Sequence, residues 1–515
     1  MQEIELRFQI PADQRQPLLA WLKQAGTLRS ERLQAAYFDT PARDLARAGF
    51  ALRLRREGRR WVQTLKGDAP DGMTRLEHNV ALGQGAAMPE LDVQRHAGHA
   101  AGDALIARVA ELGGADALYC LFRTDIRRRS ALLALDDSTL ELALDEGCLL
   151  ADIDGLTRES PVHELEIELK SGSAQAVLQL ARECVARHGL WLEQRTKALR
   201  GDLLARGLTD AAPGIAAPAA WPRGSNAAQA LGQLLRAALR PVLGNASQIA
   251  SGSHAPEHLH QLRVGLLRLA VGLQLLQDLG GKLAWPREAL RTLRSDALAL
   301  RRRLSAWRDA DAQAAAPWQR SLTAAWLATG LSEEEAPRTP PERQTQSPAD
   351  LLRSSETQAL MLALLALLAG PAAAESAVGP RTPGSAALKR ACETRLAKQQ
   401  AALRSSGKRI SSLSASDRHH LRQRLRRLRY ALEQTAELLP ETKAGKRLQA
   451  LKRLHQELGE LNDLELILQQ ARQLAAEQRQ LHAAFALGYL GAERERRLQL
   501  ADAAWRRWRK YNSRD

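Results

Sequence analysis

The chain of 515 residues is longer than one hydrophobic core usually organises, so we expect at least two domains. Its net charge of +16 predicts an anionic partner, and its four cysteines form no CxxC pair, which argues against a disulfide framework and a zinc site. The N-terminus opens with charged residues, and the longest apolar run is too short to span a bilayer. We therefore expect a soluble cytoplasmic protein without a membrane partner.

The positive charge is concentrated in the C-terminal part of the chain. Residues 1–205 carry 27 Lys and Arg against 30 Asp and Glu, which leaves 47 against 28, a net +19, for residues 206–515. Linker composition, rich in Pro, Gly and Ala without apolar periodicity, occurs at residues 207–226, 332–350 and 370–385. We predict one domain at residues 1–205, a linker at 206–225 and a basic domain at 226–512.

Period-2 alternation predicts β-strands in the first domain. Charged side chains share one strand face in five segments: Glu3, Glu5 and Arg7 in EIELR, Arg53 and Arg55 in ALRLR, Arg75 and Glu77 in RLEHN, Glu141 and Asp145 in ELALD, and Glu164, Glu166 and Glu168 in HELEIELK. A solvent-exposed face explains any one of these strands. Five strands, some acidic and some basic, favour a closed barrel with a polar lining.

The charged faces suit a site for metal ions and phosphate. Carboxylates two residues apart on adjacent strands can share Mg²⁺ or Mn²⁺, and arginine pairs match phosphate oxygens bidentately. The sequence contains no glycine-rich GxxxxGK[ST] loop. Side chains, rather than the N-terminus of a helix, must therefore bind any phosphate in this domain.

Seven segments follow one another over residues 3–201: EIELRF, YFDTPARDLARAGFALRLR, TLKG, RLEHNVAL, ELALDEG, HELEIELKSG and KALRG. In this order they resemble the CYTH domain of triphosphate tunnel metalloenzymes, and within that family the bacterial inorganic triphosphatases that carry a C-terminal CHAD domain. The resemblance implies an α+β protein whose N-terminal part is a closed, eight-stranded antiparallel tunnel with flanking helices.

The resemblance also implies the roles of the charged residues. Divalent metal, Mg²⁺ or Mn²⁺, would be bound by Glu3, Glu5, Glu166 and Glu168, with Asp145 nearby. The phosphates would be held by Arg53, Arg55, Lys66, Arg128 and Lys197. Arg7 stands where the family usually has Lys, so a catalytic role at that position is limited to a fixed charge. The implied reaction is the metal-dependent hydrolysis of inorganic triphosphate to phosphate and pyrophosphate.

Residues 226–510 are rich in Leu, Ala and Arg, and their apolar residues recur every three or four positions, which predicts helices. HQLRVGLLRLAVGL from His260 aligns with HHLRQRLRRLRYAL from His419, and WRDAD at Trp307 with LNDLE at Leu461. We predict two copies of one helical unit, at about 226–331 and 386–512. Their leucines form apolar stripes, and basic residues occupy the remaining positions: His260, Arg263 and Arg268 in the first copy, and His419, Arg422, Arg426, Arg427 and Arg429 in the second.

This repeat resembles the CHAD domain, a pair of helical bundles related by a pseudo-twofold axis. The resemblance implies that these eight basic residues bind long-chain polyphosphate. The first copy has Leu267 and Ala270 where Arg is common, so the two copies can contribute unequally. Nucleic acid is the competing partner, but an aromatic content of 4% offers few stacking platforms.

Three functions remain open on the same fold. They are a triphosphatase; a class IV type adenylate cyclase, or another nucleoside or thiamine triphosphatase; and a polyphosphate-binding scaffold without catalysis. The basic helical region favours the first, and the full set of four metal-site glutamates argues against the last. The sequence leaves open the preferred triphosphate, Mg²⁺ or Mn²⁺, the oligomeric state, and association with polyphosphate granules. It also does not decide whether the helical domain feeds substrate to the barrel or only tethers the protein.

Overall fold

The computed structural model describes residues 2–68, 74–217, 227–279, 287–305, 307, 317–328, 330, 347–369, 385–407, 409–438, 441–478 and 481–512. The chain forms two compact units. The first comprises Met1–Ile215, Leu239–Leu262 and Ser347–Gly370, and the second comprises Ala216–Ala238, Arg263–Gln346 and Pro371–Asp515. Most of the three linker-like stretches, and WRDAD after Trp307, lie outside the described residues. The domain boundaries expected from the sequence stay predictions.

The first unit contains a nine-stranded antiparallel sheet with strand order β5-β4-β3-β2-β6-β7-β8-β1-β9. Its strands are β1 (Gln2–Gln9), β2 (Arg29–Asp39), β3 (Phe50–Glu57), β4 (Arg60–Asp68), β5 (Thr74–Gln84), β6 (Tyr119–Leu135), β7 (Ser138–Ile153), β8 (Leu156–Ser171) and β9 (Trp191–Leu192). The helices between and after them are η1 (Ala12–Gln14), α1 (Arg15–Ala25), α2 (Asp44–Arg47), η2 (Val93–His96), α3 (Ala100–Glu111), η3 (Ala115–Ala117), α4 (Ala174–His188) and α5 (Lys197–Ala205).

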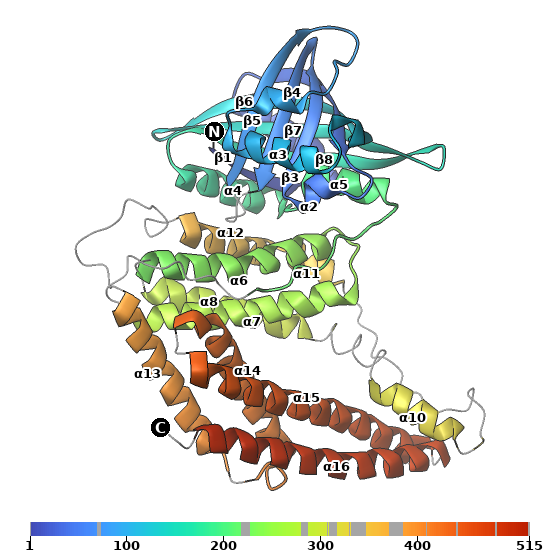
Figure 1. Cartoon of the computed structure of the whole chain (residues 1–515), viewed down its shortest axis with the longest axis vertical. Coiled ribbons are helices and arrows are strands. Elements are labelled where there is room, and N and C mark those ends of the chain that lie inside the picture. The colour runs from blue at the N-terminus through green and yellow to red at the C-terminus, as the bar shows by residue number, and fades with distance from the viewer. Residues whose placement is uncertain are drawn as a thin grey trace. The chain divides into compact units, whose positions relative to one another are not determined.

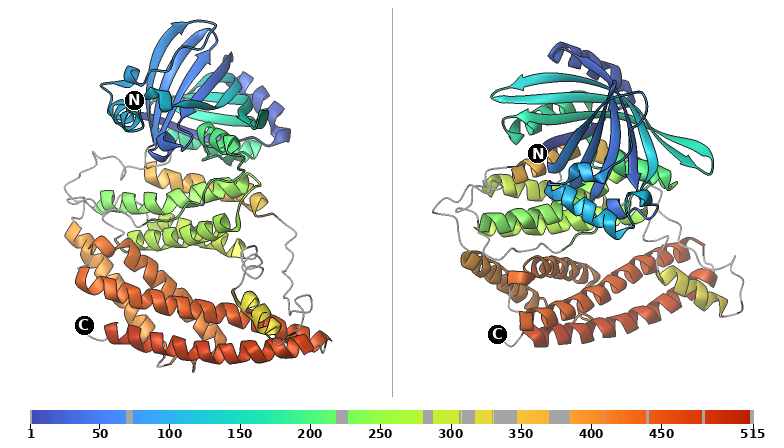
Figure 2. Two further views of the ribbon diagram at one scale, coloured as in Figure 1. Left: turned by 45° about the vertical axis from the view of Figure 1, so that its right-hand side comes forward. Right: turned by 45° about the horizontal axis from the view of Figure 1, so that its top comes forward.

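The sheet is strongly twisted and curved (Figures 1 and 2). β1 pairs with β8 over Glu5–Gln9 and, in a short contact of three residues, with β5 over Gln2–Ile4. The α+β prediction, with an antiparallel N-terminal sheet and a helical C-terminal region, is confirmed. The closed eight-stranded barrel is not established by this sheet and stays a prediction.

The alternation of side chains gives the sheet one apolar and one charged face. On β1, Leu6 and Phe8 are almost fully buried, and Leu165 and Ile167 of β8 are completely buried. Helix α4 packs on β1, β7 and β8, so these residues meet its apolar side. The residues that alternate with them, such as Glu5 and Glu166, face the other side of the sheet, where they line a cavity.

Helices from later in the chain complete the first unit. They are the later part of α6 (Ala227–Ala250), the beginning of α7 (Pro256–Leu279), α11 (Pro348–Arg353) and α12 (Ser355–Ala369). Helix α12 is apolar on all sides and packs against α4. Its Gln358 accepts a hydrogen bond from the Leu192 amide of β9 at 2.8 Å. Within the described residues, no helix is long and apolar enough to cross a membrane.

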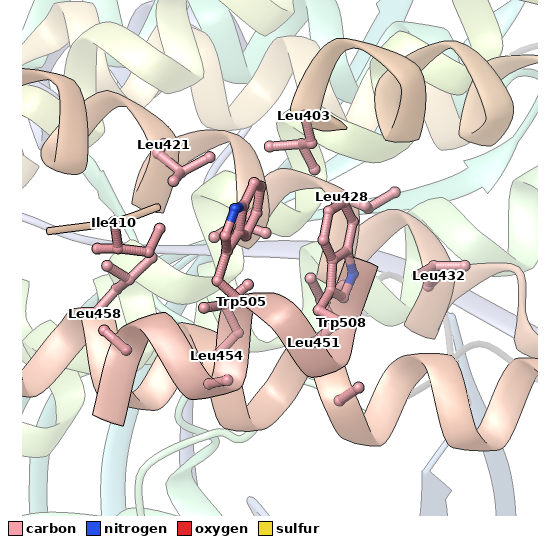
Figure 3. Packing of buried hydrophobic residues seen from close by; sticks show 14 of the residues in the cluster. Leu403, Ile410, Leu421, Leu428, Leu432, Leu451, Leu454, Leu458, Trp505 and Trp508 are labelled. Atoms are coloured by element: carbon pink, nitrogen blue, oxygen red, sulfur yellow. The ribbon is translucent and has the colours of Figure 1, made fainter. Parts of the chain in front are cut away.

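The second unit is helical in its described residues. With the beginning of α6 and the rest of α7, it contains α8 (Arg287–Arg303), α10 (Pro317–Leu327), α13 (Ser385–Arg404), α14 (Ala415–Gln434), η4 (Ala436–Leu438), α15 (Glu441–Gln478) and α16 (Leu481–Asn512). The long helices α15 and α16 pack along each other. Figure 3 shows part of the core, where Trp505 and Trp508 lie beside Leu421 and Leu428 of α14. The two tryptophan rings stack with their centroids 5.0 Å apart. The apolar stripe expected on α14 is therefore the face that packs into this core.

Three histidines meet where η2 and α3 cover the sheet. His78 of β5 hydrogen-bonds His96 between their Nδ1 atoms at 2.9 Å, and its ring stacks on His99 at 4.8 Å. His96 is fully buried, and burial, together with the charges of His78, His99 and Arg95, lowers its pKa to about 4. The folded protein therefore disfavours the charged form of His96.

We expect acid to loosen this contact. Above pH about 6.5, His96 is neutral in the folded and the unfolded segment, so its protonation does not affect stability. As the pH falls from about 6.5 towards 4, the unfolded segment takes up a proton first, and local opening should increase by up to about tenfold per pH unit. Hydrogen exchange of residues 93–111, corrected for intrinsic rates, measures this, and His96→Phe should remove the effect. Equal protection at pH 7 and pH 5 in the wild type would contradict it.

Candidate active site

The curved sheet of the first unit encloses a cavity of about 1280 Å³. Charged side chains of both signs line it. The cations are Arg7, Arg53, Arg55, Lys66, Arg128, Lys170, Lys197 and Arg240, and the carboxylates are Glu5, Asp39, Glu77, Glu141, Asp145, Glu166, Glu168 and Asp202. The pattern of alternating charges seen in the sequence thus corresponds to one continuous surface.

The residues that the sequence assigns to metal and phosphate binding lie together in this cavity, except Glu3, whose side chain is not described. The lining includes Glu5, Arg7, Arg53, Arg55, Lys66, Arg128, Asp145, Glu166, Glu168 and Lys197. The backbone of Glu3 pairs with Arg75, but its side chain lies outside the described part of the structure. The functional roles of all these residues stay predictions.

Three carboxylates form a row across adjacent strands. Glu5 of β1 lies opposite Glu168 of β8, and Glu168 lies opposite Glu141 of β7. Lys170 Nζ is 2.7 Å from Glu141 and 2.8 Å from Glu168, while Arg7 Nε is 3.4 Å from Glu5. Like charges on directly opposite positions repel, so these cations stabilise an arrangement that is otherwise unfavourable.

A second network surrounds Lys197, the first residue of α5. Lys197 Nζ is 2.9 Å from Asp145, 2.7 Å from Glu164 and 2.8 Å from Glu166. Burial alone would lower the pKa of Lys197, but the three carboxylates outweigh it and raise the pKa. Burial would likewise raise the pKa of Glu166, but Lys197, Arg128 and Arg7 hold it well below its usual range. Lys197 and Glu166 are therefore both ionised at neutral pH.

Local structure fixes both cations of this network. Thr196 caps α5, since its Oγ1 accepts a hydrogen bond from the Leu199 amide at 2.9 Å. Arg128 donates two hydrogen bonds of 2.7 Å to Asp145, opposite which it lies in the β6–β7 pairing, and also contacts Glu166. Among the four neighbouring arginines of β6, Arg128 is the one that lines the cavity.

Strands β3 and β4 supply three further cations of the lining. Arg53 donates a hydrogen bond to the Tyr37 hydroxyl at 3.0 Å, and Arg55 pairs with Glu57. Lys66 Nζ is 2.8 Å from Glu77, which lies opposite it on β5. Burial alone would raise the pKa of Tyr37, but the charge of Arg53 and its hydrogen bond lower it. These strands therefore present an electropositive surface to the cavity.

The donor chemistry fits a hard divalent cation. The row of Glu5, Glu168 and Glu141 offers only oxygen ligands, which Mg²⁺ and Mn²⁺ prefer. Its three negative charges exceed the two positive charges of Lys170 and Arg7, with which these carboxylates pair in this structure. In the described residues, no group of three His, Cys, Asp or Glu side chains adopts a geometry that could hold a metal ion.

The sequence predicts Glu141 on a charged strand face but gives neither Glu141 nor Lys170 a role in the site, although both line the cavity. The Asp154–Gly155 turn could have indicated them, because both residues have positive φ and an Asp-Gly turn sets the register of a β-hairpin. Counting back from Ile153 opposite Leu156 brings Glu141 opposite Glu168. Arg240 also lines the cavity, and no local pattern predicts it.

The basic residues predicted on the helices divide into different environments. Arg263 donates to the Ser305 hydroxyl at 3.0 Å. Arg268 pairs with Glu433 and lies 4.8 Å from the Tyr430 ring, on which Arg429 also stacks at 4.8 Å. Both Arg263 and Arg268 are buried, so they have structural partners inside the protein.

Three of the other predicted residues surround His455 of α15, and the two histidines lie in other environments. Arg426 Nε donates to His455 Nε2 at 3.1 Å, and burial together with the charges of Arg429, Arg426 and Arg422 lowers the pKa of His455 to about 2. His419, on the exposed side of α14, contacts Asn462 at 3.1 Å. His260 belongs to the part of α7 in the first unit, and it is half-buried.

Arg427 lines a smaller cavity of about 240 Å³ in the second unit. Three further arginines line it: Arg294, Arg395 and Arg424. Arg424 could have been found, because it lies three residues before Arg427 and so on the same side of α14. Arg294 and Arg395 come from α8 and α13, and only the tertiary structure brings them there.

Two domain families match the chain. Residues 1–201 match the CYTH domain, and residues 233–472 match the CHAD domain. An inorganic triphosphatase of Haemophilus influenzae is 28% identical over 217 residues, which are 40% of this chain and 55% of that protein. The match thus spans about half the length of this curated relative.

Two solved structures are similar in part. The CHAD domain from the plant Ricinus communis aligns with a TM-score of 0.40 and 26% identity over 57% of this chain and 96% of that chain. HpAC1 from Hippeastrum, an adenylyl cyclase candidate reported to have a dominant triphosphatase activity, aligns with a TM-score of 0.28 and 19% identity over 40% of this chain and 96% of that chain.

Proposed function

The chain carries a CYTH domain at residues 1–201 and a CHAD domain at residues 233–472, and from this premise we propose that it is a metal-dependent inorganic triphosphatase. The observation that carries the proposal is the lining of the sheet cavity. A row of carboxylates on β1, β8 and β7 and a set of cations on β3 and β4 face the same space. A polyanion and its metal ion need this combination of charges.

The chain's own residues would act mainly by positioning. Arg53, Arg55 and Lys66 bind the phosphate oxygens and orient the terminal phosphorus towards an attacking water. Glu5, Glu168 and Glu141, together with Glu3 as predicted from the sequence, would hold Mg²⁺ or Mn²⁺. A divalent ion bound there neutralises phosphate charge and lowers the pKa of a water. Water adds to the terminal phosphorus, the bond to the bridging oxygen breaks, and phosphate and pyrophosphate leave.

Lys197 and Arg128 have a different position from the other cations. A lysine ammonium has three N–H donors, and those of Lys197 face three carboxylates. To bind phosphate, as predicted from the sequence, Lys197 must exchange one of these contacts for a phosphate oxygen. We propose that both cations first hold Asp145 and Glu166 in place and contact phosphate only when substrate is bound.

The proposed activity is tested by product analysis with the purified chain. Triphosphate, ATP, thiamine triphosphate and long-chain polyphosphate are each incubated with Mg²⁺, Mn²⁺ or EDTA, and the products are separated. We expect phosphate and pyrophosphate from triphosphate, at a rate that EDTA abolishes. Cyclic AMP from ATP would identify a cyclase, and no turnover of any substrate would leave a binding protein.

For the helical region we propose binding of long-chain polyphosphate. Residues 206–515 carry the whole net positive charge, and arginines gather around His455 and around the smaller cavity. A flexible chain with a charge on every phosphate can reach such separate groups of arginines more easily than a stiff duplex can.

Removing two cavity arginines should weaken polyphosphate binding. We expect the double variant Arg424→Ala with Arg427→Ala, in the full chain, to bind polyphosphate about tenfold more weakly. The slope of log K against log salt concentration should become about 2 less steep, because each phosphate contact that is lost no longer releases counterions. The control removes the same charge at Arg506 and Arg507, which are exposed on α16. Equal losses in both variants, or displacement of labelled polyphosphate by DNA or RNA at equal phosphate concentration, would refute a specific polyphosphate site.

A further inference from the structure

Arg240 lines the sheet cavity, although it lies outside the residues that match the CYTH domain. It lies on α6, within the residues that match the CHAD domain, and belongs to the same compact unit as the sheet. Its side chain is exposed, and it lines the cavity together with Gln194, Thr196 and Lys197. A helix of the basic region thus adds a cation to the cavity formed by the sheet.

The position of α6 at this edge is fixed by buried hydrogen bonds. Ser247 lies seven residues after Arg240, so both occupy the same side of the helix. Ser247 Oγ accepts a hydrogen bond from the Gln194 amide at 3.0 Å and donates one to Glu193 Oε1 at 2.5 Å. The segment that carries Lys197 is therefore bound to the side of α6 that presents Arg240.

Glu193 connects the contact between α6 and the Lys197 segment to strand β1. It is 2% exposed, pairs with Arg195 at 2.7 Å, and accepts a hydrogen bond from Gln9 at 3.1 Å. Its amide donates to the Arg7 carbonyl at 2.8 Å. Because every one of these groups is buried or half-buried, α6 and the cavity wall hold a defined relative position within the first unit.

Among the described residues, Arg240 has no internal partner, which distinguishes it from the other cations of the lining. Arg7, Lys66, Arg128, Lys170 and Lys197 each pair with carboxylates. Across the residues that the structure describes, Arg240 makes neither an ion pair nor a hydrogen bond. An exposed guanidinium without a partner can bind an incoming phosphate without first breaking an existing contact.

The cavity also has room for more than a triphosphate. Its volume of about 1280 Å³ exceeds the roughly 300–1,000 Å³ typical of sites that enclose a drug-sized ligand. We infer that Arg240 binds a phosphate group beyond the third in a linear chain, so that the site accepts tetraphosphate and longer linear phosphates. This inference rests on the proposed function. Water adds to the terminal phosphorus, the bridging P–O bond breaks, and the chain leaves one phosphate shorter.

Steady-state kinetics of the full-length protein test this inference. The substrates are triphosphate, tetraphosphate and a medium-chain polyphosphate, and the variants are Arg240→Ala and Arg240→Lys. We expect Arg240→Ala to raise KM for the two longer substrates by about tenfold and to change kcat/KM for triphosphate by less than about twofold. Arg240→Lys should retain most of the affinity, because it keeps the charge. Arg236→Ala, one turn earlier on α6 and not part of the lining, is the matched control.

Two results would overturn the inference: an equal loss for triphosphate and tetraphosphate, or no loss for either. Calorimetric titration of the same variants with triphosphate and tetraphosphate in EDTA measures binding without hydrolysis. It therefore distinguishes failure of this inference from failure of the proposed function. If the wild type hydrolyses nothing, the proposed function fails, yet a selective loss of tetraphosphate affinity in Arg240→Ala would still assign Arg240 to the longer chain. Equal affinities of all variants for both ligands would remove that assignment too.

Discussion

Replacing Glu168 by glutamine is expected to lower kcat for triphosphate by about 10²- to 10³-fold, the size of effect seen when one electrostatic group is removed from a transition state. Glu168 is the middle carboxylate of the row, with Glu5 and Glu141 on either side. Glutamine keeps the shape but removes the charge that would attract a divalent ion. Part of the loss should be recovered at high Mg²⁺, so activity is measured as a function of metal concentration, and Glu5→Gln should behave in the same way.

Stability measurements separate this effect from misfolding. Because Glu168 faces two other carboxylates, its neutralisation relieves repulsion, and the variant should unfold at the same temperature as the wild type or higher in EDTA. Glu159→Gln, at an exposed position of the same strand, is the control and should keep full activity. If Glu5→Gln and Glu168→Gln both retain wild-type activity, the row is not a metal site.

Much of the sheet cavity could be predicted because strand periodicity is local. The alternation in EIELR and HELEIELK fixes which residues share a face, whatever the neighbouring strands are. Which residues face one another across strands depends on register, which hairpin turns set. The β6–β7 turn brings Arg128 opposite Asp145, a choice among four close arginines that alternation alone could not make.

Contacts between segments distant in sequence could not be predicted. Arg263 and Arg268 fit the basic pattern of the helical repeat, but Ser305 and Glu433 are their partners inside the protein. A helical pattern shows which side of a helix is polar, and it does not tell solvent from a buried ion pair. Arg240 gives the opposite case, because no motif marks it and only the docking of α6 through Ser247 brings it to the cavity.

Replacing Lys197 by methionine should have the largest effect on stability. The change leaves Asp145, Glu164 and Glu166 without the cation they share, and Glu164 is completely buried. Removing one partner of a buried ion pair costs about 3–5 kcal/mol. Arg128 still pairs with Asp145 and Glu166, and Arg200 with Glu164, so we expect a loss near the lower end of this range. Calorimetry should show the unfolding of the first unit at a clearly lower temperature. Arg206→Met, at an exposed position just beyond α5, is the control, with an expected change below about 1 kcal/mol.

A double variant separates the structural role of Lys197 from a role in binding phosphate. Adding Glu164→Gln removes one of the three carboxylate charges that Lys197 neutralised, so Lys197→Met with Glu164→Gln should recover part of the lost stability. The cycle of single and double variants measures the coupling. If Lys197 also contacts substrate, the double variant should fold but keep a raised KM for triphosphate. Recovery of stability together with wild-type kinetics would show instead that Lys197 serves only to hold the carboxylates, and the cations of β3 and β4 would then be left as the phosphate-binding groups.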